Sequence, residues 1–406
     1  MRVHEKNTPP SSLNDDEIEP MGEELMNFDE MEEINLEEYD MEEEVYDDEG
    51  EEIEPSEDHA FMVFDKHKGA VFCSDLHPNG KIAVTGGIDD KAYVWSVTTS
   101  EVIMECSDRK DSVLFVGFSF DGAYLAIIDF HGLIKVYKCN LDENQQGPWP
   151  QVFQYQAGDF IWGLWHFGTN VLFFGDKSGD IFVFKIPTGE TKVLQGHNMQ
   201  TECGKMFHDG RRLAAGYSDG NVKIWDVKSS TILHQVKVAS EVRDIDVHHD
   251  DTLVAAISAE GEAILITPNN GKIVAKWMTD DDLELVVFSK NPLLDLISLG
   301  ALNGSLTLWD TATKILRHHC TKNNPELPFG VTRMIWIKDK IVTARLDASI
   351  RAYDARYNDS KIRGRLRIHR GGVWRSSSIP LLMGGTVYPS ADWQRHHSTH
   401  LCSEHT

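Results

Sequence analysis

From about residue 60 onward, apolar and polar residues alternate over short runs that turn residues separate. In GYSDGNVKIWDV (216–227), Val222 and Ile224 flank Lys223, which is the period of a strand buried on one face. Asp219-Gly220 interrupts the alternation, and Asp-Gly favours a tight hairpin turn because glycine adopts positive φ without strain. The pattern therefore predicts successive antiparallel strands and an all-β fold.

This alternating unit recurs along the chain. An apolar anchor residue ends a strand in each unit, at intervals of 41 to 47 residues: Trp95, Tyr137, Phe184, Trp225, Ile266, Trp309 and Tyr353. Six residues before each anchor stands a polar turn residue: Asp89, His131, Ser178, Asp219, Glu260, Asn303 and Asp347. A period in the low forties with several short strands per unit is typical of WD40 β-propeller blades. We predict a propeller with seven readable repeats.

The outer strands indicate one blade more than these seven units. Seven runs are predicted to be outer strands: 101–107, 151–157, 190–196, 231–237, 272–278, 314–320 and 364–370. An eighth run, 60–66, precedes the first unit, and propellers close by pairing such a strand with inner strands from the C-terminus. Those inner strands would come from 373–406, where two prolines and the loss of alternation predict an irregular or incomplete eighth blade. Either this blade is irregular, or the C-terminus differs from the one that closes the ring.

The net charge of −26 is concentrated at the N-terminus. Residues 1–60 carry 25 acidic and 2 basic residues, so the rest of the chain is almost neutral. We predict a disordered acidic tail over 1–59, a propeller over 60–372, and a degenerate blade or irregular tail over 373–406. Within the acidic tail, residues 34–48 mix apolar side chains with carboxylates. This segment is either solvated, or docks on a basic partner or on the chain's own basic-peptide site.

Several protein classes are excluded by the remaining composition. The six cysteines, at 73, 106, 139, 203, 320 and 402, include no CxxC pair, which argues against zinc-ribbon and redox motifs. MRVHEKNTPP lacks the apolar core of a signal peptide, and no apolar run is long enough to span a membrane. We expect a monomer in the cytoplasm, with the nucleus as a second compartment.

Two histidine-rich stretches raise the question of a metal site. His248, His249, Asp250 and Asp251 fall at a predicted hairpin tip and are interpreted as a turn. His396, His397, His400, Cys402 and His405 fall in the C-terminal stretch and are interpreted as part of a tail. We therefore expect neither a metal nor a cofactor.

Polar residues inside the repeats predict hydrogen-bonded blade networks. The first unit holds His67, Thr85, Asp89 and Trp95, and the fourth holds His197, Asp219 and Trp225, with Ala215 where a hydroxyl would stand. Asp347 is the corresponding turn residue of the seventh unit. These residue types also occur in catalytic triads, but they repeat around the ring and no GxSxG motif is present. The networks are therefore predicted to be structural, and the protein is not expected to be an enzyme.

The sequence resembles the angio-associated migratory cell protein family over roughly residues 60–370. The resemblance rests on TGGIDDKAYVW (85–95), QAGDFIWGLWH (156–166), GYSDGNVKIWD (216–226), LRHHC (316–320) and YDAR (353–356), and on the acidic tail before the repeats. It implies an eight-bladed propeller. It also implies either a chaperone for a newly made, basic large-subunit ribosomal protein, as in fungal relatives, or a scaffold in cell migration and signalling, as in animal members. The chain departs from the family pattern in its eighth blade.

Acidic residues gather at the position just before each unit's first inner strand. That position holds Ala70, Ser112, Asp159, Glu202, Glu241, Asp282 and Gly330. The predicted binding residues are these acids with their acidic and aromatic neighbours: Asp111, Asp159, Phe160, Trp162, Glu202, Glu241, Asp281 and Asp282. Carboxylates and aromatic rings suit an Arg/Lys-rich segment through charge-assisted hydrogen bonds and cation–π contacts. The alternative is that acidic residues simply favour exposed loops.

The predicted function is thus a protein-binding module that chaperones or scaffolds a basic client, with ribosome biogenesis as the candidate process. Direct nucleic-acid binding is not expected, because no basic stripe appears outside 361–375 and the acidic tail would repel phosphate. A signalling scaffold or a ubiquitin-ligase substrate adaptor is the alternative. The adaptor hypothesis rests on Tyr353, Asp354 and Arg356, which resemble a WDxR element with Tyr in place of Trp.

Overall fold

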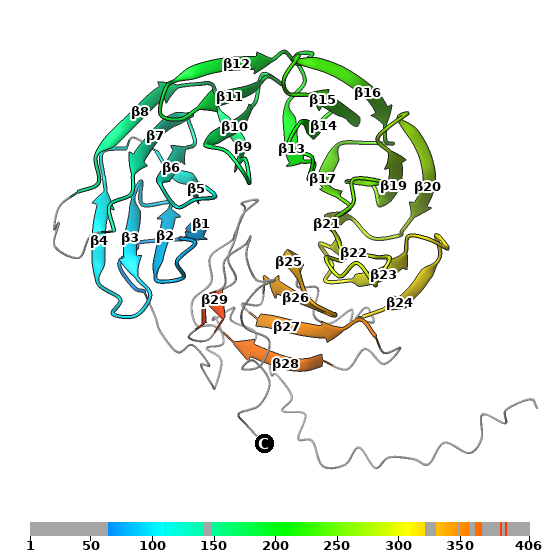
Figure 1. Cartoon of the computed structure of the whole chain (residues 1–406). Helices are drawn as coiled ribbons and strands as arrows, with labels where there is room; N and C mark the ends of the chain where they lie inside the picture. The colour runs from blue at the N-terminus through cyan, green and yellow to red at the C-terminus, as the bar shows by residue number, and fades with distance from the viewer. Residues whose placement is uncertain are drawn as a thin grey trace, which may run out of the picture. The chain divides into compact units, whose positions relative to one another are not determined.

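Seven four-stranded antiparallel sheets follow one another along the chain in the computed structural model. The structure describes residues 64–109, 111–141, 148–320, 330–346 and 349–356, and the strand backbones at 362–367, 382–383 and 386–387. The sheets, numbered 1 to 7 in chain order, are arranged around a central axis (Figure 1). Each is built from four consecutive strands, and the first strands of neighbouring sheets contact one another.

The strand bounds follow the predicted units closely. Sheets 1 and 2 contain β1 (Val71–Leu76), β2 (Ile82–Gly87), β3 (Ala92–Ser96), β4 (Val102–Cys106), β5 (Val113–Phe118), β6 (Tyr124–Asp129), β7 (Leu133–Lys138) and β8 (Gln151–Gln156). Sheets 3 and 4 contain β9 (Phe160–Trp165), β10 (Val171–Asp176), β11 (Ile181–Lys185), β12 (Glu190–Leu194), β13 (Thr201–Met206), β14 (Arg212–Tyr217), β15 (Asn221–Asp226) and β16 (Thr231–Lys237). Sheets 5 and 6 contain β17 (Val242–Val247), β18 (Val254–Ser258), β19 (Glu262–Thr267), β20 (Lys272–Met278), β21 (Leu283–Phe288), β22 (Leu296–Ala301), β23 (Leu306–Asp310) and β24 (Leu316–His319). Sheet 7 contains β25 (Val331–Ile337), β26 (Lys340–Arg345), β27 (Ser349–Asp354) and β28 (Ile362–Arg367).

The predicted all-β WD40 propeller is confirmed, and the Asp219-Gly220 turn has its predicted form. Gly220 has a φ of 84°, and its N–H donates to the Tyr217 carbonyl at 3.0 Å. One expected strand is wrong in the part that the structure describes: Phe64, Asp65 and Lys66 of the run 60–66 are not in a strand. Phe64 instead stacks on the Trp95 ring, with the ring centroids 4.5 Å apart. Its side chain thereby covers apolar residues of sheet 1 that would otherwise face solvent.

Other predictions lie outside the described residues. These are the acidic tail 1–59 with its segment 34–48, residues 60–63, the turn residue Asp347, and the histidines and Cys402 of the C-terminal stretch. Of the expected eighth blade, the structure describes a short hairpin, β29 (Leu382–Met383) paired with β30 (Thr386–Val387). The chain divides into two compact units, Met1–Ile53 and Glu54–Thr406, and the second contains every described strand. Within the described residues, no helix has the length and apolarity to span a membrane.

The hydrophobic core lies between neighbouring sheets. One cluster joins Val84 and Val94 of sheet 1 to Val113, Leu125 and Ile127 of sheet 2, all fully buried. Corresponding clusters lie between the later sheets. Inner strands are therefore buried on both faces, which explains their nearly continuous burial, whereas the outer strands β4, β8, β12, β16 and β20 alternate or are largely exposed.

Buried carboxylates tie β1 to β5 and β17 to β21. The Asp75 carboxylate on β1 accepts the Phe118 N–H of β5 at 2.7 Å, and Asp246 on β17 accepts the Phe288 N–H of β21 at 2.8 Å. Burial raises the pKa of Asp75 to about 7, although the hydrogen bonds from Phe118 and Leu76 oppose that rise.

We expect Asp75→Asn to change how the stability of the protein depends on pH. Because the pKa of Asp75 is raised in the native state, its contribution to stability is present below about pH 4 and is lost as the pH rises through about 7. The asparagine variant should therefore be more stable than the parent protein by about 1–2 kcal/mol at pH 8, and nearly equal at pH 4. Urea titrations at both pH values measure this difference. The exposed Asp295→Asn change is the control, and a difference that does not depend on pH would contradict the expectation.

Candidate functional site

The predicted binding residues lie at the face where each first strand begins. In all seven sheets, the residue after the second strand donates its N–H to the carbonyl of the residue before the first strand, at 2.9–3.1 Å. Neighbouring sheets meet at this same end: Phe160 N–H donates to Phe130 O at 2.9 Å, and Thr201 Oγ1 donates to Asp176 O at 3.0 Å. We call the carboxylates here the acidic rim: Asp111, Asp159, Glu202, Glu241, Asp281 and Asp282.

A histidine lies between the acidic rim residues of sheets 2 and 3. His131 Nε2 lies 3.1 Å from Asp111 Oδ2, and His131 Nδ1 lies 3.4 Å from Asp159 Oδ1. The His131 side chain is 63 % exposed, so this cluster is open to solvent. His131 was predicted from its spacing as a turn residue, and its position between two carboxylates is not visible in the sequence because the three residues come from separate loops.

The other rim carboxylates are partly engaged in local contacts. Glu241 Oε1 accepts a hydrogen bond from Arg243 Nη1 at 3.0 Å, and Glu202 Oε1 accepts one from Gln200 Nε2 at 2.9 Å. Asp281 accepts a hydrogen bond from the Asn303 side chain, and Asp282 is exposed. A carboxylate has two oxygens with several acceptor positions, so a local hydrogen bond does not by itself saturate it.

Three predicted site residues need correction. Glu202 does not precede its strand: β13 begins at Thr201, and Gln200 holds the equivalent position. Phe160 and Trp162 are 5 % and 4 % exposed, so neither ring can stack on a bound cation. Both point into contacts between neighbouring sheets, because a first strand packs against a sheet on each side and buries alternate residues there.

The blade networks form in part. His67 Nδ1 lies 2.9 Å from Asp89 Oδ1, and His67 Nε2 lies 2.9 Å from Thr85 Oγ1, as expected. Trp95, however, is not part of the network: its indole N–H has no hydrogen-bond partner within the described residues. The ring instead packs against Phe64 in the edge cluster of sheet 1.

The network of sheet 4 uses a lysine where the hydroxyl is missing. His197 Nε2 lies 3.1 Å from Asp219 Oδ2, and Lys223 Nζ donates to His197 Nδ1 at 2.8 Å. Since the ammonium group can only donate, the His197 proton is on Nε2 and points to Asp219. Burial lowers the pKa of Lys223, and Asp219 partly offsets this effect. Trp225 lies in the apolar core, and its N–H has no partner in the part of the chain that the structure describes.

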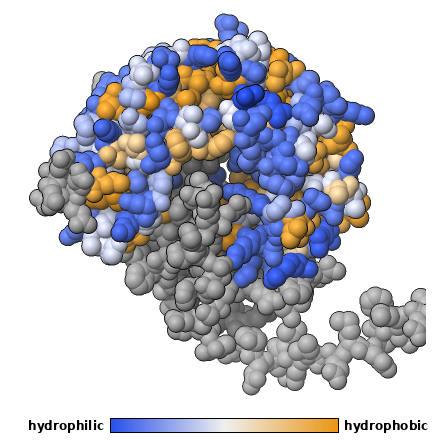
Figure 2. Space-filling model, viewed as in Figure 1, coloured by the Kyte–Doolittle hydropathy of each residue, from blue (hydrophilic) through white to orange (hydrophobic). Residues whose placement is uncertain are grey.

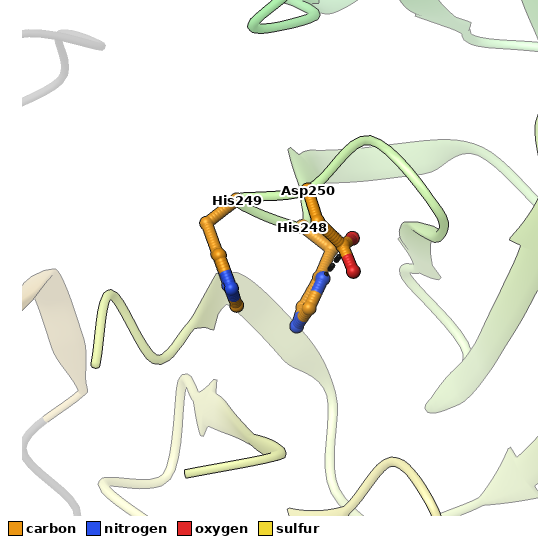
Figure 3. A group of neighbouring side chains, drawn as sticks. All are labelled: His248, His249 and Asp250. Atoms are coloured by element: carbon orange, nitrogen blue, oxygen red, sulfur yellow. Dashed lines mark hydrogen bonds and ion pairs between the residues drawn. The ribbon is translucent and has the colours of Figure 1, made fainter. Parts of the chain in front are cut away.

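Among the described residues, one group has the spacing of metal ligands: His248, His249 and Asp250. Figure 3 shows the three side chains on one turn, with both imidazole rings on the same side. Asp250 Oδ1 accepts hydrogen bonds from Thr252 N–H at 2.9 Å and Thr252 Oγ1 at 2.6 Å, and His248 Nδ1 lies 2.5 Å away. Burial disfavours the ionised carboxyl, but these bonds outweigh it and lower the pKa of Asp250. His248, Asp250 and Thr252 thus form a hydrogen-bonded turn, as the sequence predicts.

The adaptor motif makes local contacts. The Arg356 guanidinium binds Asp354 through two hydrogen bonds, Nε to Oδ1 at 3.1 Å and Nη2 to Oδ2 at 2.9 Å, and Nη1 lies 3.6 Å from Asp339 Oδ2. Tyr353 is buried. The contacts of Arg356 and Asp354 thus lie at the end of β27, and the adaptor hypothesis stays a prediction.

Comparisons with known proteins agree with the fold. Residues 60–96 match the WD domain, G-beta repeat model, and residues 194–246 match the anaphase-promoting complex subunit 4 WD40 domain model. Angio-associated migratory cell protein of Homo sapiens is 32 % identical over 322 residues, covering 74 % of this chain and 71 % of that protein.

Fungal proteins are more distant in sequence. Ribosome assembly protein SQT1 of Saccharomyces cerevisiae is 21 % identical over 338 residues, covering 74 % of this chain and 76 % of that protein. The crystal structure of Chaetomium thermophilum Sqt1 bound to the N-terminus of the ribosomal protein L10 has a TM-score of 0.69 and 21 % identity, covering 77 % of this chain and 91 % of the Sqt1 chain. At this identity the likeness shows the shared fold.

Proposed function

The chain belongs to the angio-associated migratory cell protein family, and on this premise we propose that its acidic rim binds a basic segment of a protein client. The observation that carries the proposal is the rim itself. Six carboxylates from five neighbouring sheets and their loops lie at one face of a propeller whose own sequence, after residue 60, is almost neutral. Such a local concentration of negative charge favours arginine and lysine side chains over other ligands.

The geometry of the rim suits an extended ligand. Its carboxylates come from the loops of five successive sheets, which favours a segment that carries several basic side chains over a single cation. Arg243, beside Glu241, and His131, between Asp111 and Asp159, would compete with a bound cation locally. Asp282 is exposed, and no cation of the described residues forms an ion pair with it, so we assign it the strongest single contribution.

A ribosomal protein is the client class that we propose. Sqt1 of Chaetomium thermophilum binds the N-terminus of ribosomal protein L10, and its relative in Saccharomyces cerevisiae is a ribosome assembly protein. A newly made ribosomal protein carries basic segments that are unpaired until they meet RNA, and an acidic propeller face can shield them. The proposed role is non-catalytic and requires no cofactor.

We expect a basic ribosomal protein to co-purify with the tagged full-length chain at low salt and to be lost at high salt. The reason is that contacts between exposed charges weaken as added ions screen them. Quantitative mass spectrometry at about 50 mM and about 500 mM salt measures the change, with an unrelated WD40 protein as the control. Signalling proteins or cullin adaptors, with no basic protein among the partners at either salt concentration, would support the scaffold or adaptor alternative and refute this proposal.

A further inference from the structure

Large apolar side chains occur at equivalent positions beside the acidic rim. The position is the residue directly after the second strand of each sheet, whose N–H is fixed by the hydrogen bond to the residue before the first strand. In sheets 1 to 7 it is occupied by Ile88, Phe130, Lys177, Ser218, Ala259, Leu302 and Leu346. Because the backbone is held the same way in all seven sheets, the side chain at this position is free to vary without changing the turn.

Four of these side chains are apolar and open to solvent. Ile88 is 51 % exposed, Phe130 42 %, Leu302 45 % and Leu346 48 %. We call these four residues the apolar arc. Ile88 and Phe130 belong to sheets 1 and 2, the first in chain order, and Leu302 and Leu346 belong to sheets 6 and 7, the last. Lys177, Ser218 and Ala259 of sheets 3 to 5 are polar or small. Single exposed apolar residues are ordinary, but here four of them recur at one structural position beside the acidic rim, and this recurrence is the observation from which we argue.

The first strands of the sheets also differ in how apolar they are near this face. Every first strand has a β-bulge at its second residue, and bulges redirect side chains at the rims of such structures. The bulge residues are apolar in sheets 1 to 3 and charged in sheets 4 to 6: Phe72, Leu114, Ile161, Glu202, Arg243 and Glu284. In Figure 2, hydrophobic surface lies beside β9 and hydrophilic surface beside β13 and β17 at the central opening.

We infer that the apolar arc binds apolar side chains of the same basic segment that the acidic rim holds, so that the preferred partner is an amphipathic basic peptide. This inference rests on the proposed function. Charge complementarity selects the occupant. The Phe130 N–H binds the carbonyl of Ser112, the residue after Asp111, and the Leu302 N–H binds the carbonyl of Asp282. An apolar group on Phe130 or Leu302 therefore brings its neighbours close to carboxylates. The chain's own acidic tail, with a net charge of −23 over residues 1–60, would be repelled there.

The test compares two arginine-rich peptides of equal charge on the full-length protein. One contains leucine and tyrosine between the arginines, and in the other those residues are serine. The parent protein should bind the first peptide roughly tenfold or more tightly, because apolar burial adds to the ionic contacts. The combined change Ile88→Gln, Phe130→Gln, Leu302→Gln and Leu346→Gln should remove this preference and leave salt-sensitive binding of both peptides.

A matched control replaces four outer-strand residues of similar exposure by glutamine: Val102, Val193, Ile232 and Ile273. It should keep the preference. If the arc variant also keeps the preference, or the parent protein shows none, this inference is wrong while the proposed function stands. If neither peptide binds the parent protein, the proposed function itself fails.

Two further measurements distinguish the other possible occupants of the apolar arc. A peptide of residues 34–48 that binds the parent protein but not the arc variant would assign the arc to the chain's own tail. A parent dimer in sedimentation velocity that the arc variant lacks would assign it to a second copy. Either result overturns the inference.

Discussion

Replacing Asp159, Glu241 and Asp282 together by lysine is expected to weaken the binding of an arginine-rich peptide by more than about 100-fold. Each change removes a carboxylate from the acidic rim and places a cation where the ligand brings its own. All three side chains are at least partly exposed, so the sheets beneath them keep their packing. Fluorescence anisotropy with a labelled peptide at about 50 mM salt measures the loss, where ionic contacts are least screened.

The matched control reverses three exposed acids away from the rim, Glu101, Glu190 and Asp295, and so changes the net charge by the same amount. Its affinity should fall by no more than the general charge effect, about threefold or less. An equal loss in both variants would mean that net charge, and not the rim, governs binding. Unfolding midpoints within about 2 °C of the parent protein check that both variants are folded.

Trp162→Ala is expected to lower the free energy of unfolding by about 3–5 kcal/mol. Trp162 lies in the core between sheets 3 and 4, in a cluster with Phe173, Tyr217 and Trp225. Its ring fills the space over Gly175 and Gly204, where an added Cβ would lie 2.2 Å from indole atoms. Removing the ring leaves a cavity between two rigid sheets, which cannot collapse to fill it. Denaturant titration measures the change.

The neighbouring Ile161→Ala serves as the control, because Ile161 is the half-buried bulge residue of the same strand. It should cost under about 2 kcal/mol. Below the unfolding transition, the Trp162 variant should still bind the basic peptide within about threefold of the parent protein. A selective loss of binding with normal stability would restore Trp162 to the binding site and contradict the buried position that we assign to it.

Local pattern was sufficient to identify the repeats and the turns. Alternation, the six-residue spacing from turn residue to anchor, and Asp-Gly turn chemistry all act within ten residues. These short-range preferences hold in the structure: the bounds of β16 and β20 match the predicted runs, and Gly220 has a positive φ. The same reasoning placed the blade network of His67, Thr85 and Asp89, because its members hold fixed positions in one repeat. It also placed Asp159, Glu241 and Asp282 directly before the first strands of their sheets, whereas Glu202 lies inside β13.

Tertiary packing decided which of those residues are available to a ligand. Phe160 and Trp162 have the composition of a cation-binding site, but first strands are packed on both sides, so both rings are buried. The sequence could not show that His131 meets Asp111 and Asp159, because those contacts join loops of different sheets. Nor could it show that Ile88, Phe130, Leu302 and Leu346 occupy one position around the ring, since their relation depends on how seven sheets align. The sequence by itself determined the WD40 fold and where the strands of each sheet begin and end. Which side chains face solvent at the acidic rim was decided by the contacts between sheets, because exposure depends on neighbours that lie far away along the chain.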